Sequence, residues 1–594
     1  MEADRTAHAL GRWRFGFAVV ADSHLEPEVD GLALPRSNAR NRFIVAQLRA
    51  MAPAFVVHLG DIVHPVPRAP AHDATLLLAH ALYAPLACPV LYTPGNHDIG
   101  DKHGDLAPAS SMTEAALQGY ARVFGPPCAV HRHGDCHVVT LDSCVLNSGL
   151  PAEAAQRRWL EAQLHALHGQ RLFLAMHYPL FLVTPDEASH YDHIDAPARH
   201  WLLDLIRRHR VEAVFCGHVH HFFWNRLDGT EFYVLPSTSF TRRDYSEMFR
   251  GAPTDEFGRN DAAKLGFFWV DVHDGGHVAR FVRTGGQTTA SQDLILPGHP
   301  KDGAGLPLGL WLRHPWCELT ELPHNPPVDE FARRRARNDY AVQALWDFGV
   351  RVLRAPVDDL RDARVRARVA DLVTLGHRFT FFSAGLPDEA LLADLRAHAG
   401  LVARWECVLP LSRVEALVER VRPLVRDTGL CIVLSALRSG AQGNTGKSAD
   451  RHFAGPGFRL EEVAQAEAVL RGVGAGVIGG LGFALPRGSV LDESLAALQA
   501  LAQRVRAAVV VTCSMLPDGP NDSVLDDATI EREVRDIVEA ARRVPGVEVM
   551  LDTFVDIDRG YYVRHGLVDR ALNWRGAGRW LAQQAAGLRQ GGGA

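Results

Sequence analysis

The sequence predicts a mixed α/β protein with two large domains, the second of which is a (β/α)8 barrel. Its 594 residues exceed what a single hydrophobic core normally accommodates. Short β-rich runs alternate with helical stretches along nearly the whole chain, which is typical of largely parallel sheets covered by helices. From residue 308 onward, eight such units follow one another, which is the strand count of a closed (β/α)8 barrel.

In the first half, runs rich in aliphatic and aromatic residues predict eight strands. They lie at residues 15–21, 55–59, 90–93, 138–141, 172–176, 211–216, 231–235 and 267–272. A helix is expected to begin near Ser37, which would cap it, because Phe43, Ile44 and Leu48 share one helical face.

A stretch without apolar periodicity, rich in Gly, Pro, Ser and Thr, separates the two halves. We expect a first domain over residues 1–290, a linker at 291–306, a TIM-like barrel at 307–586 and a loose tail at 587–594. Helices are predicted at 328–348 and 529–543, and an open doubly wound sheet is the alternative to the barrel. The barrel strands are expected at 308–312, 350–353, 379–382, 401–408, 430–434, 476–479, 508–512 and 547–551.

The composition is that of a soluble globular protein, with 47% apolar and 22% charged residues and a net charge of -6. This acidic balance argues against a nucleic-acid-coating surface. The nine cysteines are scattered without a C-x-x-C pair, which fits a reducing compartment. No run reaches the roughly 18 apolar residues of a membrane span. The first apolar run leads directly into Asp22 and does not resemble a secretion signal, so a cytoplasmic protein is expected.

Five short polar motifs, each just after a hydrophobic run, carry the chemistry of the first half. The carboxyl ends of strands share one edge of an α/β sheet, so motifs that are distant in sequence are expected to meet there. Together they offer carboxylates, an amide and imidazoles, which is the ligand set of a two-metal site. The motifs are Asp22-Ser-His24, Gly60-Asp61, Gly95-Asn96-His97-Asp98, His177 and Gly217-His218-Val-His220.

Each motif alone has an ordinary explanation, and only the combination is specific. Asp22 and His24 are two apart and point the same way from a strand, but Asp-x-His is usually surface or N-cap chemistry. His177 alone would be a satisfied core histidine, and Gly-Asn-His-Asp alone would be a turn. Asp61 has two oxygens and can bridge two cations, whereas Asn96 offers a neutral oxygen that limits the negative charge. The ordered set therefore predicts two adjacent metal ions.

Over residues 15–280, these motifs resemble those of the calcineurin-like metallophosphoesterase family. The resemblance implies a four-layer α/β/β/α sandwich in the N-terminal half. It implies that one metal is held by Asp22, His24, Asp61 and His220, and the other by Asp61, Asn96, His177 and His218. The motifs look most like the class III branch of cyclic-nucleotide and glycerol phosphodiesterases. His64 stands where purple acid phosphatases carry a tyrosine, which disfavours that branch.

The chemistry implied is hydrolysis of a small phosphodiester, with a metal-bridging hydroxide as nucleophile. Asp61 would bridge the two metals, Asn96 would help to stabilise the phosphate oxygens, and His97 would protonate the leaving group. Asp98 either orients His97 or caps the next turn. Ligation by O and N without thiolate suits two divalent ions of Mn, Fe, Zn or Co.

Two loops are expected to shape the pocket, at 184–197 and 239–261. His193 from the first loop, and Arg242 and Arg243 from the second, are candidate substrate-binding residues; a solvated loop or a domain contact explains them equally well. The main rival is a phosphomonoesterase with the same site. No nucleic acid or membrane partner is expected, and the oligomeric state stays open.

The second half offers polar residues at its expected strand ends, but no decisive motif. Glu406 and Asp552 could flank a glycosidic bond, but the seventh strand ends in Thr512-Cys513-Ser514 without a carboxylate. A carbohydrate-active or ligand-binding barrel, with the first domain as its accessory, therefore stays an alternative to a role in substrate recognition, packing or oligomerisation. Arg313, Arg354 and Arg438 could form an anion pocket.

Overall fold

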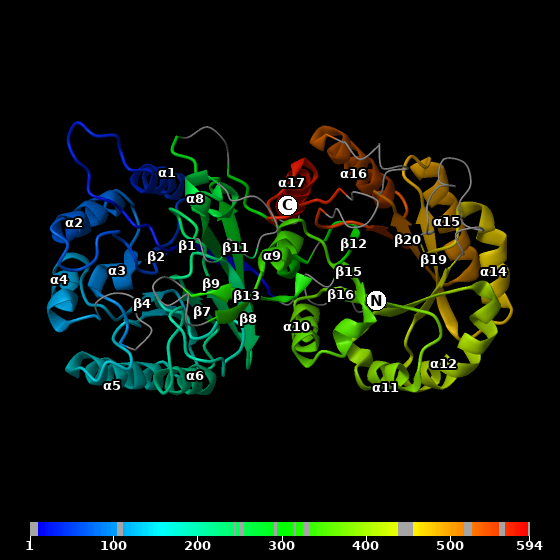
Figure 1. The fold of residues 1–594 in the computed structure, drawn as a ribbon, viewed down its shortest axis with the longest axis horizontal. Helices are drawn as coiled ribbons and strands as arrows, with labels where there is room; N and C mark the ends of the chain where they lie inside the picture. Colours follow the sequence, from blue (N-terminus) through cyan, green and yellow to red (C-terminus); the bar gives the residue numbers. More distant parts are fainter. Residues whose placement is uncertain are drawn as a thin grey trace. The chain divides into compact units, whose positions relative to one another are not determined.

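The protein's structure, a computed structural model, forms two compact units (Figure 1). The first unit consists of Ala9–Leu296 and Glu318–Tyr340. The second unit consists of Pro297–Cys317 and Ala341–Ala594. The residues described are 10–103, 111–242, 245, 248, 255–289, 294–303, 305–313, 316–324, 333–437, 456–515, 526–556 and 565–591.

The first unit contains two large β-sheets and a two-stranded hairpin. In chain order, the strands of the first sheet are β1 (Trp13–Val20), β2 (Val56–His58), β3 (Val90–Tyr92), β10 (Gly266–His273) and β11 (Gly276–Arg283), arranged β11-β10-β1-β2-β3. Those of the second are β4 (Ala129–His133), β5 (Cys136–Thr140), β6 (Arg171–Ala175), β7 (Ala213–Cys216), β8 (Phe223–Leu227) and β9 (Thr230–Val234), arranged β4-β5-β6-β7-β9-β8.

Aromatic side chains from the two sheets fill the space between them. The ring of Phe17 on β1 stacks on Phe55 at 4.6 Å and meets Phe173 of β6 edge-on at 5.8 Å. Such contacts combine a large buried apolar area with a favourable ring geometry. The sheets therefore form the two inner layers of a sandwich.

Helices form the two outer layers. Helix α1 (Arg36–Met51) and helix α2 (His72–Tyr83) contribute Phe43, Ile44, Leu48 and Tyr83 to a core with the first sheet. Helices α5 (Pro151–Ala166) and α6 (Ala198–His209) lie side by side and bury leucines against the second sheet (Figure 1). The predicted four-layer sandwich is confirmed. The unit also contains α3 (Asn96–Ile99), α4 (Glu114–Phe124) and α8 (Asp255–Gly258).

The cap expected for the first helix is wrong. Helix α1 begins at Arg36 and Pro35 occupies the N-cap position, where no side chain caps it. The hydroxyl of Ser37 instead donates to Glu26 Oε1 at 3.0 Å. Proline favours this entry because its fixed φ restricts the chain before the helix.

A β-hairpin from beyond the expected linker belongs to the first unit. Its strands β13 (Leu319–Pro323) and β14 (Arg333–Arg337) pair antiparallel, and Leu322 and Ala336 join the core of the second sheet. The helix predicted over 328–348 is therefore wrong at residues 333–337, and helix α9 begins only at Tyr340. Over residues 333–336 of strand β14, exposed and buried side chains alternate, with Arg334 and Ala336 buried, which is the period of a strand; Arg337 at its end is buried as well.

The second unit is a closed barrel of eight parallel strands. Strand β12 pairs with both β15 and β21, which closes the ring and excludes the open sheet. The strands are β12 (Gly309–Trp311), β15 (Val352–Pro356), β16 (Arg378–Ala384), β17 (Arg404–Leu409), β18 (Ile432–Ala436), β19 (Ile478–Leu485), β20 (Ala508–Cys513) and β21 (Val547–Leu551). A helix follows each strand in the chain: α9 (Tyr340–Asp347), α10 (Ala363–Thr374), α11 (Glu389–Ala397), α12 (Val414–Thr428), α14 (Val463–Arg471), α15 (Leu491–Val505), α16 (Asp527–Arg542) and α17 (Gly576–Gly591).

Candidate metal centre

The five motifs predicted to bind metals come together at one edge of the sandwich. They follow β1, β2 and β3 of the first sheet and β6 and β7 of the second. Main-chain hydrogen bonds join the loops directly: Asp22 N donates to Gly60 O at 3.1 Å, and His24 N to Asp61 O at 2.9 Å. Gly217 N donates to His177 O at 2.9 Å. The loops therefore hold one another in place before any ligand binds.

Five of the predicted ligand residues have a left-handed backbone. The φ angles are 56° for Asp22, 42° for His24, 47° for Asp61, 73° for His218 and 52° for His220. A non-glycine residue in this region is uncommon and costs roughly 1–2 kcal/mol. Such conformations cluster at functional sites, because the surrounding structure must stabilise them. The sharp turns direct side chains from both sheets towards the same place.

Two glycines allow the loops to approach closely. A Cβ atom on Gly95 would lie 2.1 Å from Asp61 N and 2.3 Å from Asp61 Oδ1. A Cβ atom on Gly217 would lie 2.7 Å from Asp22 Oδ2. Any side chain at these positions would displace a ligand carboxylate, so glycine is required for this arrangement.

The first ligand group contains the four residues that the family resemblance implied for one metal. One ligand atom from each of Asp22, His24, Asp61 and His220 lies within 4.8 Å of the others, and all four side chains are buried. The Nε2 atoms of His24 and His220 are 3.0 Å apart. Asp61 Oδ2 lies 3.5 Å from His24 Nε2, and Asp22 Oδ1 lies 3.4 Å from His220 Nε2.

The second ligand group shares Asp61 with the first. Asp61 Oδ1, the other carboxylate oxygen, lies 3.3 Å from His177 Nε2. Asn96 Oδ1 is 3.0 Å from both His177 Nε2 and His218 Nδ1. The carboxylate of Asp61 therefore faces both groups, one oxygen to each, as a bridging ligand must.

Main-chain carbonyls fix two of the imidazoles. His177 Nδ1 lies 2.8 Å from Leu59 O, and His220 Nδ1 lies 2.8 Å from Phe240 O. An Nδ1–H that donates to a carbonyl leaves the Nε2 lone pair free to face a metal, as in known metal-binding histidines. The orientation of these ligands is thus set by the fold.

The charge balance of the centre requires cations. Burial and the nearby imidazoles lower the pKa of His24 and His218 well below the ordinary value, so both are neutral at pH 7. Among the described residues, neither Asp22 nor Asp61 forms an ion pair with a Lys or Arg. Two buried carboxylates without a counter-charge are costly, and divalent ions would compensate them. The donor set, with O and N but no thiolate, fits two such ions.

His97 lies beside the ligands without belonging to either group. Its main-chain N–H donates to Asp61 Oδ1 at 2.8 Å. Its Nδ1 lies 2.6 Å from His64 O, and its ring meets the His24 ring edge-on at 4.6 Å. The side chain is half-buried. If Nδ1–H donates to the carbonyl, Nε2 is available for proton exchange with a ligand.

Asp98 does cap a turn, but it is the turn that contains Asp98 and not the next one. Its Oδ1 accepts from Ile62 N at 3.0 Å and Val63 N at 3.2 Å, and its Oδ2 accepts from Gly95 N at 2.8 Å. Asp98 therefore ties the Asn96 turn to the loop that carries Asp61.

The candidate substrate residues lie next to the centre rather than in it. Arg242 is ion-paired with the buried Asp192 at 2.7 Å. His193 is buried, with its nitrogens 2.9 Å from Ile194 O and 3.1 Å from Ala188 O. Arg243 lies outside the described residues. Their contact with substrate stays a prediction.

A further group of possible ligands is formed by Glu187, His190 and His193, again within 4.8 Å of one another. However, Glu187 already accepts three main-chain N–H groups, from Leu182, Val183 and Thr184. Lys102 donates to the main-chain oxygens of His190 and His193. The group is therefore already held by hydrogen bonds and a nearby ammonium group.

Asp192 connects this region to the β13–β14 hairpin. Burial alone would raise the pKa of the Asp192 carboxyl, but the guanidinium groups of Arg242 and Arg334 hold it well below the ordinary value. Arg334, on β14, lies 2.8 Å from Asp192. The hairpin thus supports the loop that carries Tyr191.

Tyr191 is a site residue that the sequence placed in a loop but did not single out. Its hydroxyl accepts from Asn96 Nδ2 at 3.3 Å and donates to Asp101 Oδ1 at 3.3 Å. These hydrogen bonds orient the Asn96 amide, so that its oxygen faces the imidazoles of the second group. No spacing signal in the sequence indicates this contact, because Tyr191 and Asn96 are 95 residues apart.

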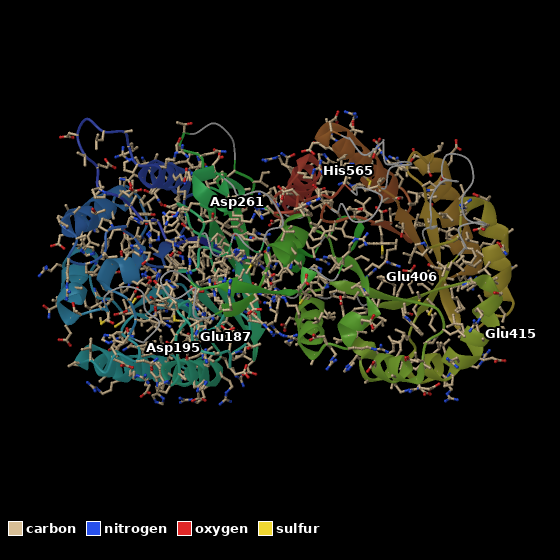
Figure 2. All side chains as sticks on the ribbon, in the orientation of Figure 1. Glu187, Asp195, Asp261, Glu406, Glu415 and His565 are labelled. Atoms are coloured by element: carbon tan, nitrogen blue, oxygen red, sulfur yellow. The ribbon has the colours of Figure 1, made fainter. Side chains whose placement is uncertain are left out.

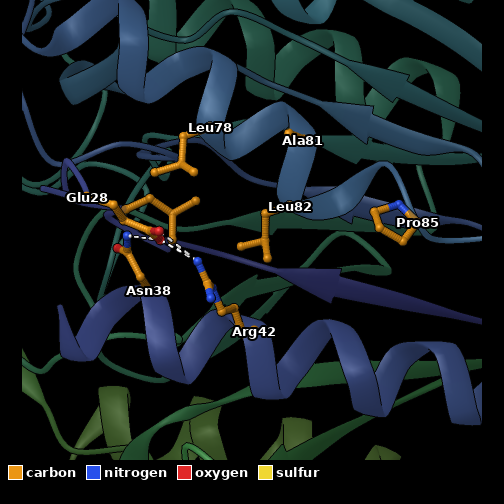
Figure 3. A pocket seen from close by; sticks show the side chains of 8 residues that line it. Glu28, Asn38, Arg42, Leu78, Ala81, Leu82 and Pro85 are labelled. Atoms are coloured by element: carbon orange, nitrogen blue, oxygen red, sulfur yellow. Dashed lines mark hydrogen bonds and ion pairs between the residues drawn. The ribbon is translucent and has the colours of Figure 1, made fainter. Parts of the chain in front are cut away.

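A pocket elsewhere in the first unit contains none of the ligand residues (Figure 3). It lies between α1 and α2, with leucines on one side and Glu28, Asn38 and Arg42 on the other. Glu28 accepts from Asn38 at 2.9 Å and from Arg42 at 2.8 Å (Figure 3). These polar groups therefore satisfy one another.

Comparison with known proteins supports this description of the site. Residues 15–222 match the calcineurin-like phosphoesterase family. Two serine/threonine-protein phosphatases CPPED1 are similar to part of this chain. The Danio rerio protein is 30% identical over 31% of this chain and 59% of its own length, and the Mus musculus protein is 31% identical over 28% and 54%. The chain thus spans little more than half the length of these relatives.

Among solved structures, a purple acid phosphatase from yellow lupin (Lupinus luteus) seeds shares 16% identity over 47% of this chain and 53% of that one, with a TM-score of 0.33. The family match covers all seven predicted metal ligands. The N-terminal region of this chain therefore contains a calcineurin-like phosphoesterase domain.

Proposed function

We propose that this protein is a two-metal phosphoric ester hydrolase that acts on small phosphodiesters. The observation that carries the proposal is the Asp61 carboxylate, whose two oxygens face two separate groups of buried ligands. Asp22, His24 and His220 would complete one metal site, and Asn96, His177 and His218 the other. Two adjacent divalent ions, when bound, supply Lewis acidity to a phosphate and ionise water near neutral pH.

The protein's own residues would position the phosphate and move a proton. The Asn96 amide, oriented by Tyr191, would fix the second ion and the phosphate oxygens near it. His97 would give a proton from Nε2 to the oxygen of the departing group. General acid assistance of this kind contributes roughly 10²–10⁴-fold and matters most for basic leaving groups.

The charges around the centre favour a diester. The nearby cationic side chains are already paired: Lys102 Nζ lies 2.8 Å from Asp195, and Arg242 lies 2.7 Å from Asp192. With these two cations already paired, the metals would provide most of the charge compensation for the phosphate. A diester carries one negative charge and needs less compensation than the dianion of a monoester.

A phosphomonoesterase with the same site is the second candidate. It is favoured by the CPPED1 relatives, which are named as serine/threonine-protein phosphatases. A protein phosphatase acts on monoesters, and its catalytic residues would be the same. The two candidates differ in substrate and not in the metal centre.

The test compares bis-p-nitrophenyl phosphate, p-nitrophenyl phosphate and a phosphoserine peptide as substrates of metal-loaded full-length protein. We expect the diester to have the highest kcat/KM. Asp61→Asn should lower all activity by about a thousandfold or more, because both metals lose a ligand. The matched control is Asp204→Asn on helix α6, where the carboxylate only pairs with exposed arginines.

The outcomes separate the proposals. If the protein prefers the monoester or the phosphopeptide, the diesterase proposal is wrong and the phosphatase proposal takes its place. Activity that survives Asp61→Asn would reject the two-metal mechanism itself. Elemental analysis of the same samples should find two equivalents of Mn, Fe, Zn or Co in the wild type and fewer in Asp61→Asn.

The cellular location is not needed for this proposal. No helix in the described part of the chain is both long and apolar enough to cross a bilayer. The cytoplasmic location expected from the sequence stays a prediction, as does the absence of a nucleic acid partner.

A further inference from the structure

Three polar residues lie side by side on the inner wall of the barrel. Trp311 of β12 is in register with Arg354 of β15, and Arg354 is in register with Thr380 of β16. Register partners in a sheet point to the same face. That face is the interior, because Trp311 packs against Val433, Val510 and Met550 from strands β18, β20 and β21.

The guanidinium group of Arg354 is rigidly held. It lies between two aromatic rings, 3.8 Å from the Trp311 centroid and 3.7 Å from that of Phe382. These rings are nearly parallel, with an interplanar angle of 22°. Arg354 Nε donates to Glu406 Oε2 at 2.5 Å, and the hydroxyl of Ser435 donates to Glu406 Oε1 at 2.6 Å (Figure 2 labels Glu406). The position and plane of the cation are therefore fixed before any ligand arrives.

Each of the three neighbours has a buried polar atom without a hydrogen-bond partner among the described residues. The atoms are Trp311 Nε1, Arg354 Nη2 and Thr380 Oγ1. Arg354 is only 2% exposed and Thr380 only 1%, so bulk water does not compensate them. Most buried polar groups in proteins are hydrogen-bonded, and three exceptions on adjacent strands require an explanation.

The chemistry of these atoms defines the missing partner. Trp311 Nε1 and Arg354 Nη2 are donors only, and the Thr380 hydroxyl can donate. The nearby carboxylates are already engaged: Glu406 as above, and Asp552 by Met515 N at 2.9 Å and Ser514 Oγ at 3.0 Å. A neutral sugar needs both donors and acceptors from its site, whereas an oxyanion needs donors only.

We propose that the interior of the barrel, beside Trp311, Arg354 and Thr380, binds the carboxylate or phosphate group of a small molecule. Arg354, Trp311 and Thr380 donate to its oxygens, and the half-exposed rings of Trp311 and Phe382 accommodate its apolar part. Guanidinium groups bind such oxyanions through strong charge-assisted hydrogen bonds. This site is separate from the metal centre and does not depend on the phosphoesterase proposal.

The test is a calorimetric titration of full-length protein freed of metal by a chelator, so that the metal centre cannot bind the anion. The probes are inorganic phosphate, acetate, malonate and, as a neutral comparison, glucose. We expect one equivalent of phosphate or of a carboxylate to bind, and which of the two binds tells the source of the oxyanion. Repeating the titration with metal-loaded protein should give the same additional equivalent.

Conservative variants identify the site. Trp311→Phe keeps the ring over Arg354 but removes the N–H, and Thr380→Val keeps the shape but removes the hydroxyl. Each variant should bind the anion about tenfold more weakly, because each removes one hydrogen bond to a charged group. The matched control is Arg378→Lys, which changes an arginine that is ion-paired with Glu548 and 42% exposed at the other end of β16.

Thermal stability gives a second readout, which does not require that the titrated anions include the natural ligand. Replacing an unpartnered buried hydroxyl by an isosteric methyl group is expected to leave the unfolding temperature of the ligand-free protein unchanged or higher. A marked loss of stability in Thr380→Val would show that the hydroxyl is already satisfied and would overturn the proposal. Binding of glucose alone, no binding of any oxyanion, or equal binding by all variants would also overturn it.

Discussion

The predicted metal centre of the first unit and the inner wall of the barrel are both buried, but their charge balance differs: the carboxylates of the first lack cationic partners, whereas the charges of the second are paired. Asp22 and Asp61 have no Lys or Arg partner among the described residues, and the imidazoles around them are available as ligands. In the barrel, Glu406 is neutralised by Arg354, and the unpartnered atoms include N–H groups. The first site therefore calls for cations and the second for an oxyanion.

The two sites also differ in their backbone. The metal ligands stand on loops, five of them with positive φ, whereas Trp311, Arg354 and Thr380 stand on regular strands. Strained loops hold their geometry only through mutual contacts, but a barrel strand is held by its ladder on both sides. We therefore expect small changes to disturb the metal centre more than the barrel.

A pair of glycine substitutions, one in each unit, tests this difference, and the first of them has the largest expected effect. In Gly95→Ala, the new Cβ would lie 2.1 Å from the main-chain nitrogen of Asp61, which cannot move without displacing the bridging carboxylate. We expect loss of metal, loss of activity, and a stability decrease of about 1–3 kcal/mol. Elemental analysis and urea unfolding measure these.

The counterpart in the barrel is Gly482→Ala. Its Cβ would lie 2.0 Å from the hydroxyl oxygen of Ser435, a single atom that can rotate away. A smaller loss of stability is expected, with full metal content and unchanged hydrolysis. If both variants lose the same stability and the same metal, the contrast between strained loops and regular strands is wrong.

The next effect concerns His97. Asn at this position keeps the main-chain N–H that binds Asp61 but removes the proton donor. We expect kcat to fall about 10²–10⁴-fold for an alkyl phosphodiester and much less for p-nitrophenyl esters, whose leaving group needs no acid. Metal content should not change. Equal losses for both leaving groups would mean that His97 does not act as the acid.

A moderate effect is expected from Tyr191→Phe. The variant removes the hydroxyl that accepts from Asn96 Nδ2 and leaves the ring in place. Since one hydrogen bond contributes about 1 kcal/mol, kcat/KM should fall about fivefold, with weaker retention of one metal on dialysis. Unchanged kinetics and unchanged metal affinity would show that Asn96 is oriented without Tyr191.

The last expected effect concerns acid stability rather than activity, and it is measured on the barrel. Burial lowers the pKa of His377, at the start of the barrel strand β16, to about 3, below the ordinary value of 6.5. The unfolded chain therefore binds a proton at higher pH, and stability falls as the pH drops from 6.5 towards 3. Burial lowers the pKa of His58 in the first unit to about 3 as well.

Between pH 7 and pH 5, His377 should account for about 2 kcal/mol of the barrel's loss of unfolding free energy. His377→Phe should remove that part from the barrel transition alone, measured by calorimetry at both pH values. His398→Gln, which changes a half-exposed histidine, is the control. Equal pH dependence in all three proteins would mean that His377 does not determine the acid sensitivity.

Much of this organisation was predictable. All eight expected strands of the first unit and all eight of the barrel are present, because each is a strongly apolar run. Three strands of the two large sheets of the first unit, β4, β8 and β11, were not expected. Two of them contain polar runs such as Ala-Val-His-Arg-His, and each pairs antiparallel with its sequence neighbour, so hairpin pairing rather than apolar periodicity defines them.

The meeting of the predicted metal ligands at one site was predictable for a different reason. Each follows a strand directly, so the rule that ligands gather at the carboxyl ends of strands applies to all of them. The orientation of Asn96 by Tyr191 was not predictable, and neither was the ion pair between Asp192 and Arg334. These contacts join residues 95 and 142 positions apart, and no local pattern encodes such a separation.

The sequence by itself determined the order of the elements, the ligand set and the chemistry that this set can support, because these depend on residue types next to apolar runs. Only the tertiary structure decided that the hairpin at 319–337 joins the first unit and that the eight strands close into a ring. It alone showed that Trp311, Arg354 and Thr380 lie side by side. Such neighbourhoods result from packing between distant segments, and packing depends on three-dimensional shape rather than on position in the chain.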